Sequence, residues 1–247
     1  MTSIPKIGAI WVYLEATPLL GLTLTLLAYL FAMTVYAKAR YNPLANPVLI
    51  TVALVVALLE VTHTPYATYF QGAQFIHFLL GPATVALAVP LYRQWSNLKQ
   101  AAWPLLAGLV AGSLTAIVSA VAIAKLLGAS TQTIASLAPK SATTPIAMAV
   151  ASELGGLPSL TAVLVISTGV LGAVTARPIL NLLRVTEAEV RGFALGVASH
   201  GIGTARAFQV SEQMGAFAGL GMGLNGVFTA IVVPILLPFL TRWLQAH

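Results

Sequence analysis

The stretch Ala138–Gly156, APKSATTPIAMAVASELGG, places a lysine and three hydroxyl side chains side by side in a chain that is otherwise almost entirely apolar. Thr144 followed by Pro145 is typical of a helix N-cap with proline at the first helical position, so we predict that a short helix begins here. The free N–H groups and the positive dipole end of such a helix attract anions. Lysine, hydroxyls and helix N-terminus together predict an anion site.

A related stretch, ASHGIGTARAFQVSEQMGA, follows sixty residues later at Ala198–Ala216. At this offset Thr204 corresponds to Thr144 and His200 corresponds to Lys140. Further positions are identical in the two stretches: Ala147 and Ala207, Val150 and Val210, Gly155 and Gly215. We interpret the pair as an internal repeat, with chance similarity between two alanine-rich helices as the alternative.

The composition predicts an all-helical polytopic membrane protein with about seven or eight transmembrane helices. Of the 247 residues 58% are hydrophobic and only 7% are charged, with a mean hydropathy of +0.91, whereas a soluble domain carries about a quarter charged residues. The net charge of +6 does not indicate nucleic-acid binding, because the basic residues stand singly at the ends of apolar runs, as interfacial anchors do. Without cysteine, disulfides and thiolate chemistry are excluded.

We expect one membrane domain over residues 1–247, with a scaffold at 1–128 and the repeat pair with the substrate site at 129–247. The broken stretches are compatible with re-entrant hairpins that dip into the membrane from opposite sides, or with full crossings whose middles are unwound. Both alternatives stay open here, and we take the hairpins as our prediction. They would form the inverted repeat of a secondary transporter, and we expect this pair to move against the scaffold in an elevator-like way.

Lys140 is the first candidate for contact with an anion, because a charge at membrane depth is costly and is functional by default. The alternative is an interfacial lysine that extends toward the headgroups. Pro139 and Ser141 on either side argue against that, because they open a helix. Thr143 and Thr144 have helix capping as their ordinary role, and this role is compatible with an anion contact.

His200 lies in Ser-His-Gly-Ile-Gly, where Gly201 and Gly203 favour non-helical backbone. It could carry a proton near neutral pH, and a purely structural histidine is the alternative. Arg206 could clamp a carboxylate with two hydrogen bonds. The alternative for Arg206 is an ion pair with Glu153 or Glu212.

Asn225 lies in the middle of an apolar helix, where a helix–helix hydrogen bond or a substrate contact would explain it. Glu153, near the end of the short helix, is either an interfacial cap or a proton-coupling group. The chain has no nucleophile elbow, phosphate loop or dinucleotide fingerprint, so we expect neither an enzyme nor a cofactor. Its histidines lack the spacing of metal ligands, so we expect no metal site.

Four segments resemble the LrgB/CidB family, which includes YohK-like bacterial proteins and the C-terminal half of the plastid glycolate/glycerate translocator. The resemblance covers nearly the whole chain and is weakest at the first two spans. The segments are LLGPATVALAVPLY, KSATTPIAMAVASELGGLPSLTAV, GVLGA and GFALGVASHGIGTARAF.

The resemblance implies two different functions. Bacterial members carry the label of antiholin-like regulators of murein hydrolase export, acting beside a small LrgA/CidA partner. The plastid relative moves small hydroxycarboxylates, and bacterial relatives have been linked to pyruvate and similar acids. A holin needs no anion site at the midplane, so the residues favour transport.

We therefore predict a secondary transporter of small monocarboxylates or 2-hydroxy acids, such as glycolate, glycerate, lactate or pyruvate, in the bacterial cytoplasmic (inner) membrane. The alternatives are an antiholin-like regulator of lysis without a substrate, or an anion channel. We expect a homodimer embedded in membrane lipid, and an LrgA/CidA-like partner is a further possibility. Transport would be coupled to protons through His200 or Glu153. The predicted substrate-binding residues are Lys140, Ser141, Thr143, Thr144, His200, Gly203, Thr204, Arg206 and Asn225.

Overall fold

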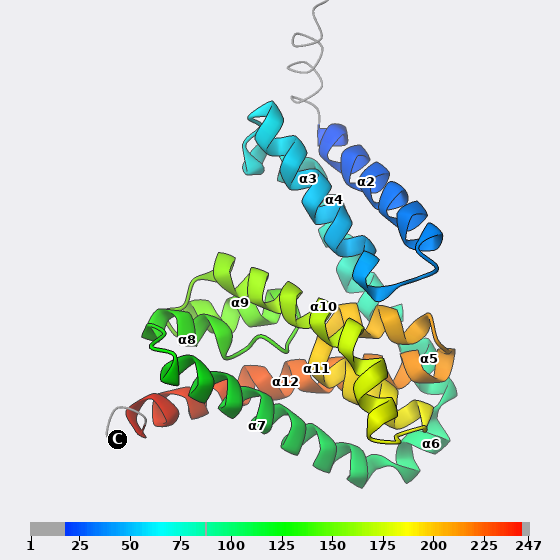
Figure 1. Cartoon of the computed structure of the whole chain (residues 1–247), viewed down its shortest axis with the longest axis vertical. Coiled ribbons are helices and arrows are strands. Elements are labelled where there is room, and N and C mark those ends of the chain that lie inside the picture. Colours follow the sequence, from blue (N-terminus) through cyan, green and yellow to red (C-terminus); the bar gives the residue numbers. More distant parts are fainter. Residues whose placement is uncertain (1–17, 87, 244–247) are drawn as a thin grey trace, which may run out of the picture. The chain divides into compact units, whose positions relative to one another are not determined.

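The computed structural model describes residues 18–86 and 88–243, and all regular structure in these ranges is helical (Figure 1). Within these ranges, four helices are long and apolar enough to cross a membrane: α2 (Pro18–Lys38), α7 (Ala102–Leu126), α10 (Pro158–Leu182) and α12 (Glu212–Trp243). Shorter apolar helices accompany them. The prediction of an all-helical polytopic membrane protein is confirmed. Fewer helices than seven or eight meet the length criterion, because several apolar runs are short or interrupted.

The chain divides into two compact units, residues 1–86 and 87–247. In the first unit, α2 packs against both α3 (Pro47–Thr62) and α4 (Tyr66–Ala86). Gly21 lies directly against the carbonyl of Tyr69, where a side chain would have no room. The hydroxyl groups of Thr25 and Tyr69 also bond across this contact at 2.8 Å. A glycine and a polar pair therefore hold α2 and α4 together.

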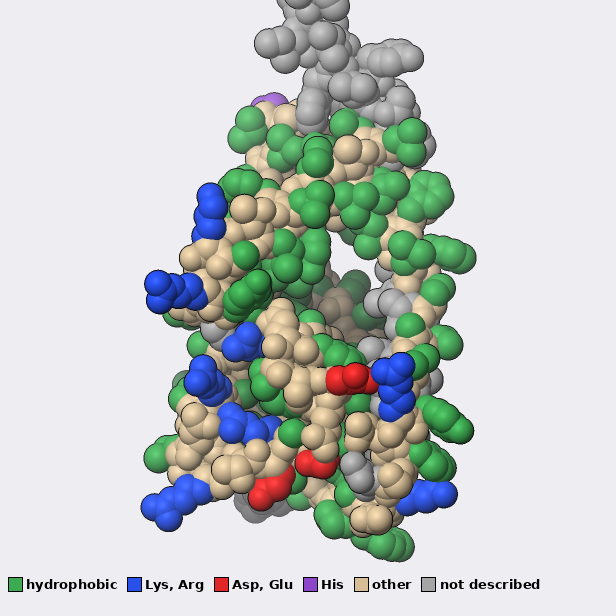
Figure 2. All heavy atoms as spheres, turned by 90° about the vertical axis from the view of Figure 1, so that its right-hand side faces the viewer, with side chains coloured by type: hydrophobic (Ala, Val, Ile, Leu, Met, Phe, Trp, Pro, Cys, Tyr) green, Lys and Arg blue, Asp and Glu red, His purple; other side chains and the backbone are tan. Residues whose placement is uncertain are grey.

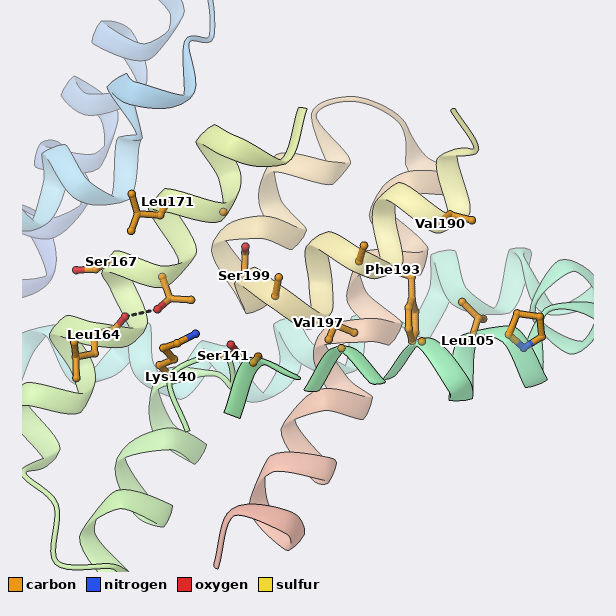
Figure 3. A pocket seen from close by; sticks show the side chains of 18 residues that line it. Leu105, Lys140, Ser141, Leu164, Ser167, Leu171, Val190, Phe193, Val197 and Ser199 are labelled. Atoms are coloured by element: carbon orange, nitrogen blue, oxygen red, sulfur yellow. Dashed lines mark hydrogen bonds between the residues drawn. The ribbon is translucent and has the colours of Figure 1, made fainter. Parts of the chain in front are cut away.

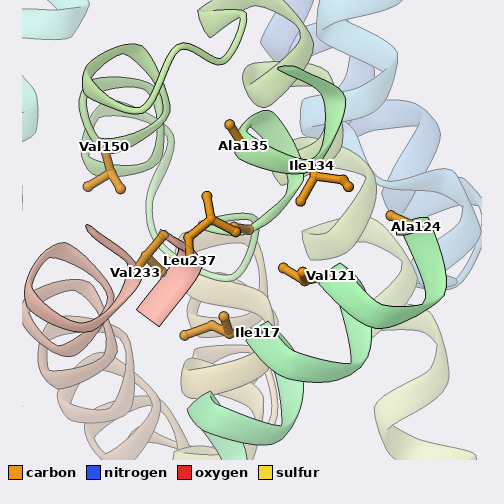
Figure 4. Packing of buried hydrophobic residues seen from close by; sticks show 9 residues of the cluster. Ile117, Val121, Ala124, Ile134, Ala135, Val150, Val233 and Leu237 are labelled. Atoms are coloured by element: carbon orange, nitrogen blue, oxygen red, sulfur yellow. The ribbon is translucent and has the colours of Figure 1, made fainter. Parts of the chain in front are cut away.

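The second unit contains the two polar stretches. Its remaining helices are α5 (Ala88–Arg93), α6 (Trp95–Gln100), α8 (Thr131–Leu137), α9 (Thr144–Glu153) and α11 (Ala188–Phe208). Its largest apolar cluster joins α7, α8, α9 and α12 (Figure 4). Burial of these side chains fixes the start of the first polar stretch to two long helices. The cluster is formed by Ile117, Val121, Ala124, Ile134, Ala135, Ala138, Val150, Val233 and Leu237.

The first polar stretch is a hairpin whose two ends meet. The buried hydroxyl of Ser136, near the end of α8, accepts a 2.8 Å hydrogen bond from the amide of Leu157, which is the N-cap of α10. Gly155 ends α9 in the left-handed conformation at φ +76°, which glycine adopts without strain. The 20 residues between Ser136 and Leu157 thus leave and return to one point. The stretch therefore has the shape of a hairpin, and its re-entry into the membrane stays a prediction.

The second polar stretch is also a hairpin, folded inside α11. His200 has φ 43° and ψ −134°, and it separates the helical residues 188–199 from 201–208. A Cβ atom on Gly203 would lie 2.7 Å from the carbonyl oxygen of Leu195. Along a straight helix these two residues would be about 12 Å apart, so the helix reverses direction at His200. Both predicted breaks are present, and both produce hairpins.

Large apolar side chains are widely exposed, and the face drawn in Figure 2 shows many of them beside scattered Lys, Arg and Glu side chains. Leu126, Leu127 and Leu182 each expose more than four fifths of their surface. Within the described residues one ion pair occurs, between Arg93 and Glu212 at 2.9 Å, with both side chains more than half exposed. Such a surface is suited to lipid rather than to water.

Candidate functional site

A cavity of about 760 Å³ lies within the second unit, between α7, α10, α11 and the segment that joins α8 to α9 (Figure 3). Its wall is mostly aliphatic, with one aromatic ring, and Lys140 is its one charged residue. The lining residues are Pro104, Leu105, Gly108, Gly112, Ala116, Lys140, Ser141, Leu164, Ser167, Thr168, Leu171, Gly172, Val190, Phe193, Ala194, Val197, Ala198 and Ser199.

Lys140 and Ser141 are the two predicted site residues that line this cavity. Both lie in the turn that follows α8, where the Lys140 amide bonds to the carbonyl of Leu137 at 3.1 Å. Lys140 is half-buried, and no carboxylate of the described chain lies within ion-pair distance of its amino group. A cation without a counter-ion in an apolar wall favours binding of an anion.

Asn225 does not line the cavity but holds this turn in place. Its side-chain amide donates a 2.9 Å hydrogen bond to the carbonyl of Ser141, and its amide oxygen accepts a 2.6 Å bond from the hydroxyl of Ser113. All three groups are buried. The helix–helix hydrogen bond that the sequence left as one alternative is therefore present, and it fixes the backbone beside Lys140.

Ser199 supplies a second polar group to the cavity, from α11. Its side chain is fully buried, and among the described residues its hydroxyl is the one buried side-chain oxygen or nitrogen that has no hydrogen-bond partner. The hydroxyl lies against Gly172 of α10, so closely that a side chain at 172 would collide with it. Burial of an unpaired hydroxyl is costly, and this cost is removed if a ligand bonds to it.

His200 points away from the cavity lining and fastens the hairpin tip to α10. Its Nε2 lies 2.9 Å from the carbonyl oxygen of Val165. Because a carbonyl only accepts, Nε2 carries the proton in this bond. The ring also packs against Gly169, where a Cβ atom would lie 2.7 Å from Cε1 of the histidine. These contacts are those of the structural alternative, and proton coupling through His200 stays a prediction.

Thr204 and Gly203 serve the hairpin rather than the cavity. The buried hydroxyl of Thr204 donates to the carbonyl of His200 at 2.9 Å. The second helical half begins at Gly201, so Thr204 lies one turn inside it and is not at a helix start. Gly203 lets the two halves approach each other. Neither residue lines the cavity.

Thr143, and not Thr144, is the N-cap of α9, so the predicted helix start is wrong by one residue. Thr144 is the first helical residue, and the proline that follows it lies in the first turn. The hydroxyl of Thr143 makes no capping bond. The helix therefore begins through proline geometry and tertiary contacts, with neither threonine lining the cavity.

Arg206 and Glu153 also lie outside the cavity lining. Arg206 donates a 3.0 Å hydrogen bond to the side chain of Gln209, one turn further along the chain. Glu153 is exposed at the end of α9. Glu212, considered above as a partner of Arg206, forms an ion pair with Arg93. The roles of Arg206 and Glu153 in binding or coupling stay predictions.

Several cavity residues were not anticipated from the sequence. Ser199 directly precedes His200, and its place in the same polar stretch was a usable signal. Ser167 and Thr168 interrupt an apolar span in its middle, which is a second signal. Gly108 and Gly112 also line the cavity, and they leave space on the cavity side of α7.

Comparisons with known proteins place these features in a family. A sequence model of the LrgB-like family matches residues 25–239. The uncharacterized protein YwbG of Bacillus subtilis is 39% identical over 90% of this chain and 98% of its own length. Antiholin-like protein LrgB of Bacillus mycoides and that of Bacillus cereus are each 32% identical over 91% of this chain and 97% of their own lengths. No solved structure matches the chain.

Proposed function

Because the chain belongs to the LrgB-like family of polytopic membrane proteins, we propose that its cavity binds a small carboxylate and carries it across the bacterial cytoplasmic membrane. One observation carries this proposal. Lys140 is the one charged residue in the wall of a 760 Å³ cavity, and its amino group has no carboxylate partner in the described chain.

The two hairpins support transport further. Broken helices that bring polar groups to the middle of a membrane domain are typical of secondary transporters. Here the cavity wall includes residues from both polar stretches, Lys140 and Ser141 from the first and Ser199 from the second. Movement of one hairpin relative to α7 would change access to the cavity. The substrate class that we propose is a monocarboxylate or 2-hydroxy acid.

An antiholin-like role is the second candidate, and the names of the relatives favour it over any particular substrate. Two of the relatives described above are called antiholin-like proteins. Under this proposal the chain would regulate murein hydrolase export or lysis without moving a substrate. The cavity would then be a packing defect or a partner contact. Nothing in such a role requires a lysine without a counter-ion in an apolar wall, and for this reason we place transport first.

Both candidates include the same assembly. We propose a homodimer in the cytoplasmic membrane, with an LrgA/CidA-like membrane protein as a further partner. The activity would be non-enzymatic and without a cofactor.

Counterflow of radiolabelled glycolate and lactate into proteoliposomes tests the proposal. The purified wild-type chain should show saturable exchange, and Lys140→Met should abolish it while the protein remains folded by thermal melting. Lys125→Met is the matched control, because Lys125 lies in the last turn of α7 and does not line the cavity. It should exchange at the wild-type rate.

A parallel lysis assay in bacteria separates the two candidates. If folded wild-type protein exchanges no acid, with or without an LrgA-like protein, and Lys140→Met still controls lysis as the wild type does, transport is overturned in favour of the antiholin-like role. If Lys140→Met loses exchange and lysis control together, the lysis effect depends on transport.

A further inference from the structure

The cavity is much larger than the small acids considered so far. Glycolate has five non-hydrogen atoms and fills on the order of 100 Å³, about the space of three or four waters. The cavity measures about 760 Å³, which is the size of pockets that hold much bulkier ligands. A two-carbon acid at Lys140 would leave most of the apolar wall facing water.

The chemistry of the wall divides the cavity into a polar part and an apolar part. Lys140, Ser141 and Ser199 come from the two hairpins (Figure 3). The part toward the start of α7 and α11 is apolar, with Leu105, Val190 and Phe193 among its residues. One charge, a few hydroxyls and a broad apolar surface are complementary to a molecule with a carboxylate at one end and an apolar body at the other.

Two glycines of α7 leave the space for that body. A Cβ atom on Gly108 would meet Cε1 of Phe193 at 4.0 Å, and one on Gly112 would meet Cγ1 of Val197 at 3.7 Å. Both are ordinary contact distances, so no helix packing requires glycine at either position. The glycines of α11 differ, because Gly192 and Gly196 lie directly against the backbone of α12. The absence of side chains at Gly108 and Gly112 thus enlarges the cavity.

We propose that this cavity selects carboxylates with an apolar body about the size of a phenyl ring or a branched chain, rather than two- or three-carbon acids. Lys140 binds the carboxylate, and Ser199 bonds to a polar group beside it, such as a 2-hydroxyl. The apolar body packs against Phe193 in the space that Gly108 and Gly112 leave. This inference rests on the proposed function and names the substrate class of the same site.

Matched ligand pairs test the size preference. The measurements are made in lipid nanodiscs, so that competition from lipid chains for the apolar cavity is the same for both ligands of a pair. Lactate and phenyllactate differ only by the phenyl ring. Each buried methylene strengthens binding about fourfold, so phenyllactate should bind at least tenfold more tightly than lactate by isothermal titration calorimetry. Phenyllactamide, which keeps the ring and loses the charge, should bind at least tenfold more weakly than phenyllactate.

Two variants test the assignment of residues. Gly112→Val narrows the cavity, so the affinity ratio of phenyllactate to lactate should fall at least fivefold. Gly223→Val is the control, because Gly223 of α12 faces open space and does not line the cavity, and the ratio should not change. Ser199→Ala should weaken phenyllactate binding about threefold or more while the melting temperature stays the same or rises, since the lost hydroxyl had no partner.

The outcomes distinguish this inference from the function on which it rests. If lactate binds as tightly as phenyllactate, or if Gly112→Val leaves the ratio unchanged, the size selection is wrong and small-acid transport still stands. Equal binding of phenyllactamide would overturn the role of the carboxylate. If no acid binds to folded protein, the inference and the proposed function both fail.

Discussion

Asn225 on α12 donates a 2.9 Å hydrogen bond to the carbonyl of Ser141, and it thereby replaces a backbone donor that the sequence removes. In a helical continuation the amide four residues later would bond to this carbonyl. That residue is Pro145, which has no N–H. Pro145, in the first turn of α9, thus leaves the Ser141 carbonyl without its backbone donor, and the side chain of Asn225 donates to that carbonyl instead.

Asn225→Leu should therefore destabilise the protein by about 2 kcal/mol or more, because two buried groups lose their partners, the Ser141 carbonyl and the Ser113 hydroxyl. Thermal melting in detergent measures this. Ser113→Ala breaks only the second bond and should have a smaller effect. An equal loss for the two variants would contradict the special role of the Ser141 contact.

Ser136→Ala should loosen the base of the first hairpin. The variant removes the acceptor for the Leu157 amide at the start of α10, and loss of such a cap costs about 1 kcal/mol. Hydrogen exchange read by mass spectrometry should speed up around residues 154–158. Ser159→Ala is the control, since Ser159 is exposed and should exchange as the wild type does. Unchanged exchange in Ser136→Ala would mean that the hairpin closes through other contacts.

His200→Asn should lower the melting temperature, and the response of transport to a pH gradient in this variant decides between the structural role and the predicted proton coupling. Asparagine, like histidine, is enriched at positive φ, so it is the substitution that best keeps the backbone of the break (φ 43°, ψ −134°) while removing the bond to Val165, which is about 1 kcal/mol. Loss of the imidazole ring also leaves a gap beside Gly169, against which the ring packs in the wild type. Loss of the pH response in folded His200→Asn would instead establish the histidine as the coupling group.

Gly196→Ala should destabilise the packing of α11 on α12. The added methyl group would collide with the carbonyl of Ala218, and such overpacking costs about 1–3 kcal/mol. Gly223→Ala, which meets open space, should melt at or slightly above the wild-type temperature because alanine favours the helix. Equal melting temperatures for the two variants would contradict this prediction. They would mean that α11 and α12 can move apart enough to accommodate a methyl group at position 196.

The sequence predicted the membrane class and both helix interruptions, because these follow from composition and from local backbone preferences. It also singled out Lys140, which lines the cavity. It misplaced the start of α9 by one residue, since the caps Thr143 and Thr144 are chemically equivalent. It also placed Thr204 at a helix start. The break lies at His200 instead, where the left-handed residue reverses the chain four positions earlier.

Which residues line the cavity could not be predicted from the sequence in the same way. A polar side chain in a hairpin faces either a neighbouring helix or the cavity. The sixty-residue spacing of the two polar stretches does not tell which of these directions a side chain takes. His200 and Ser199 are neighbours in sequence, yet the first bonds to Val165 and the second has no partner. Only the packing of α10 against the hairpin tip, through Gly169 and Gly172, decides which of the two lines the cavity.

The cavity wall is assembled from residues that span positions 104 to 199 of the chain. During synthesis the early part of this wall, on α7, leaves the ribosome well before the Ser199 hairpin does. The nascent protein therefore has no binding site until α11 has been inserted. A ligand that fits the cavity can stabilise only molecules that have completed this insertion, and so would raise the yield of correctly assembled protein in the membrane.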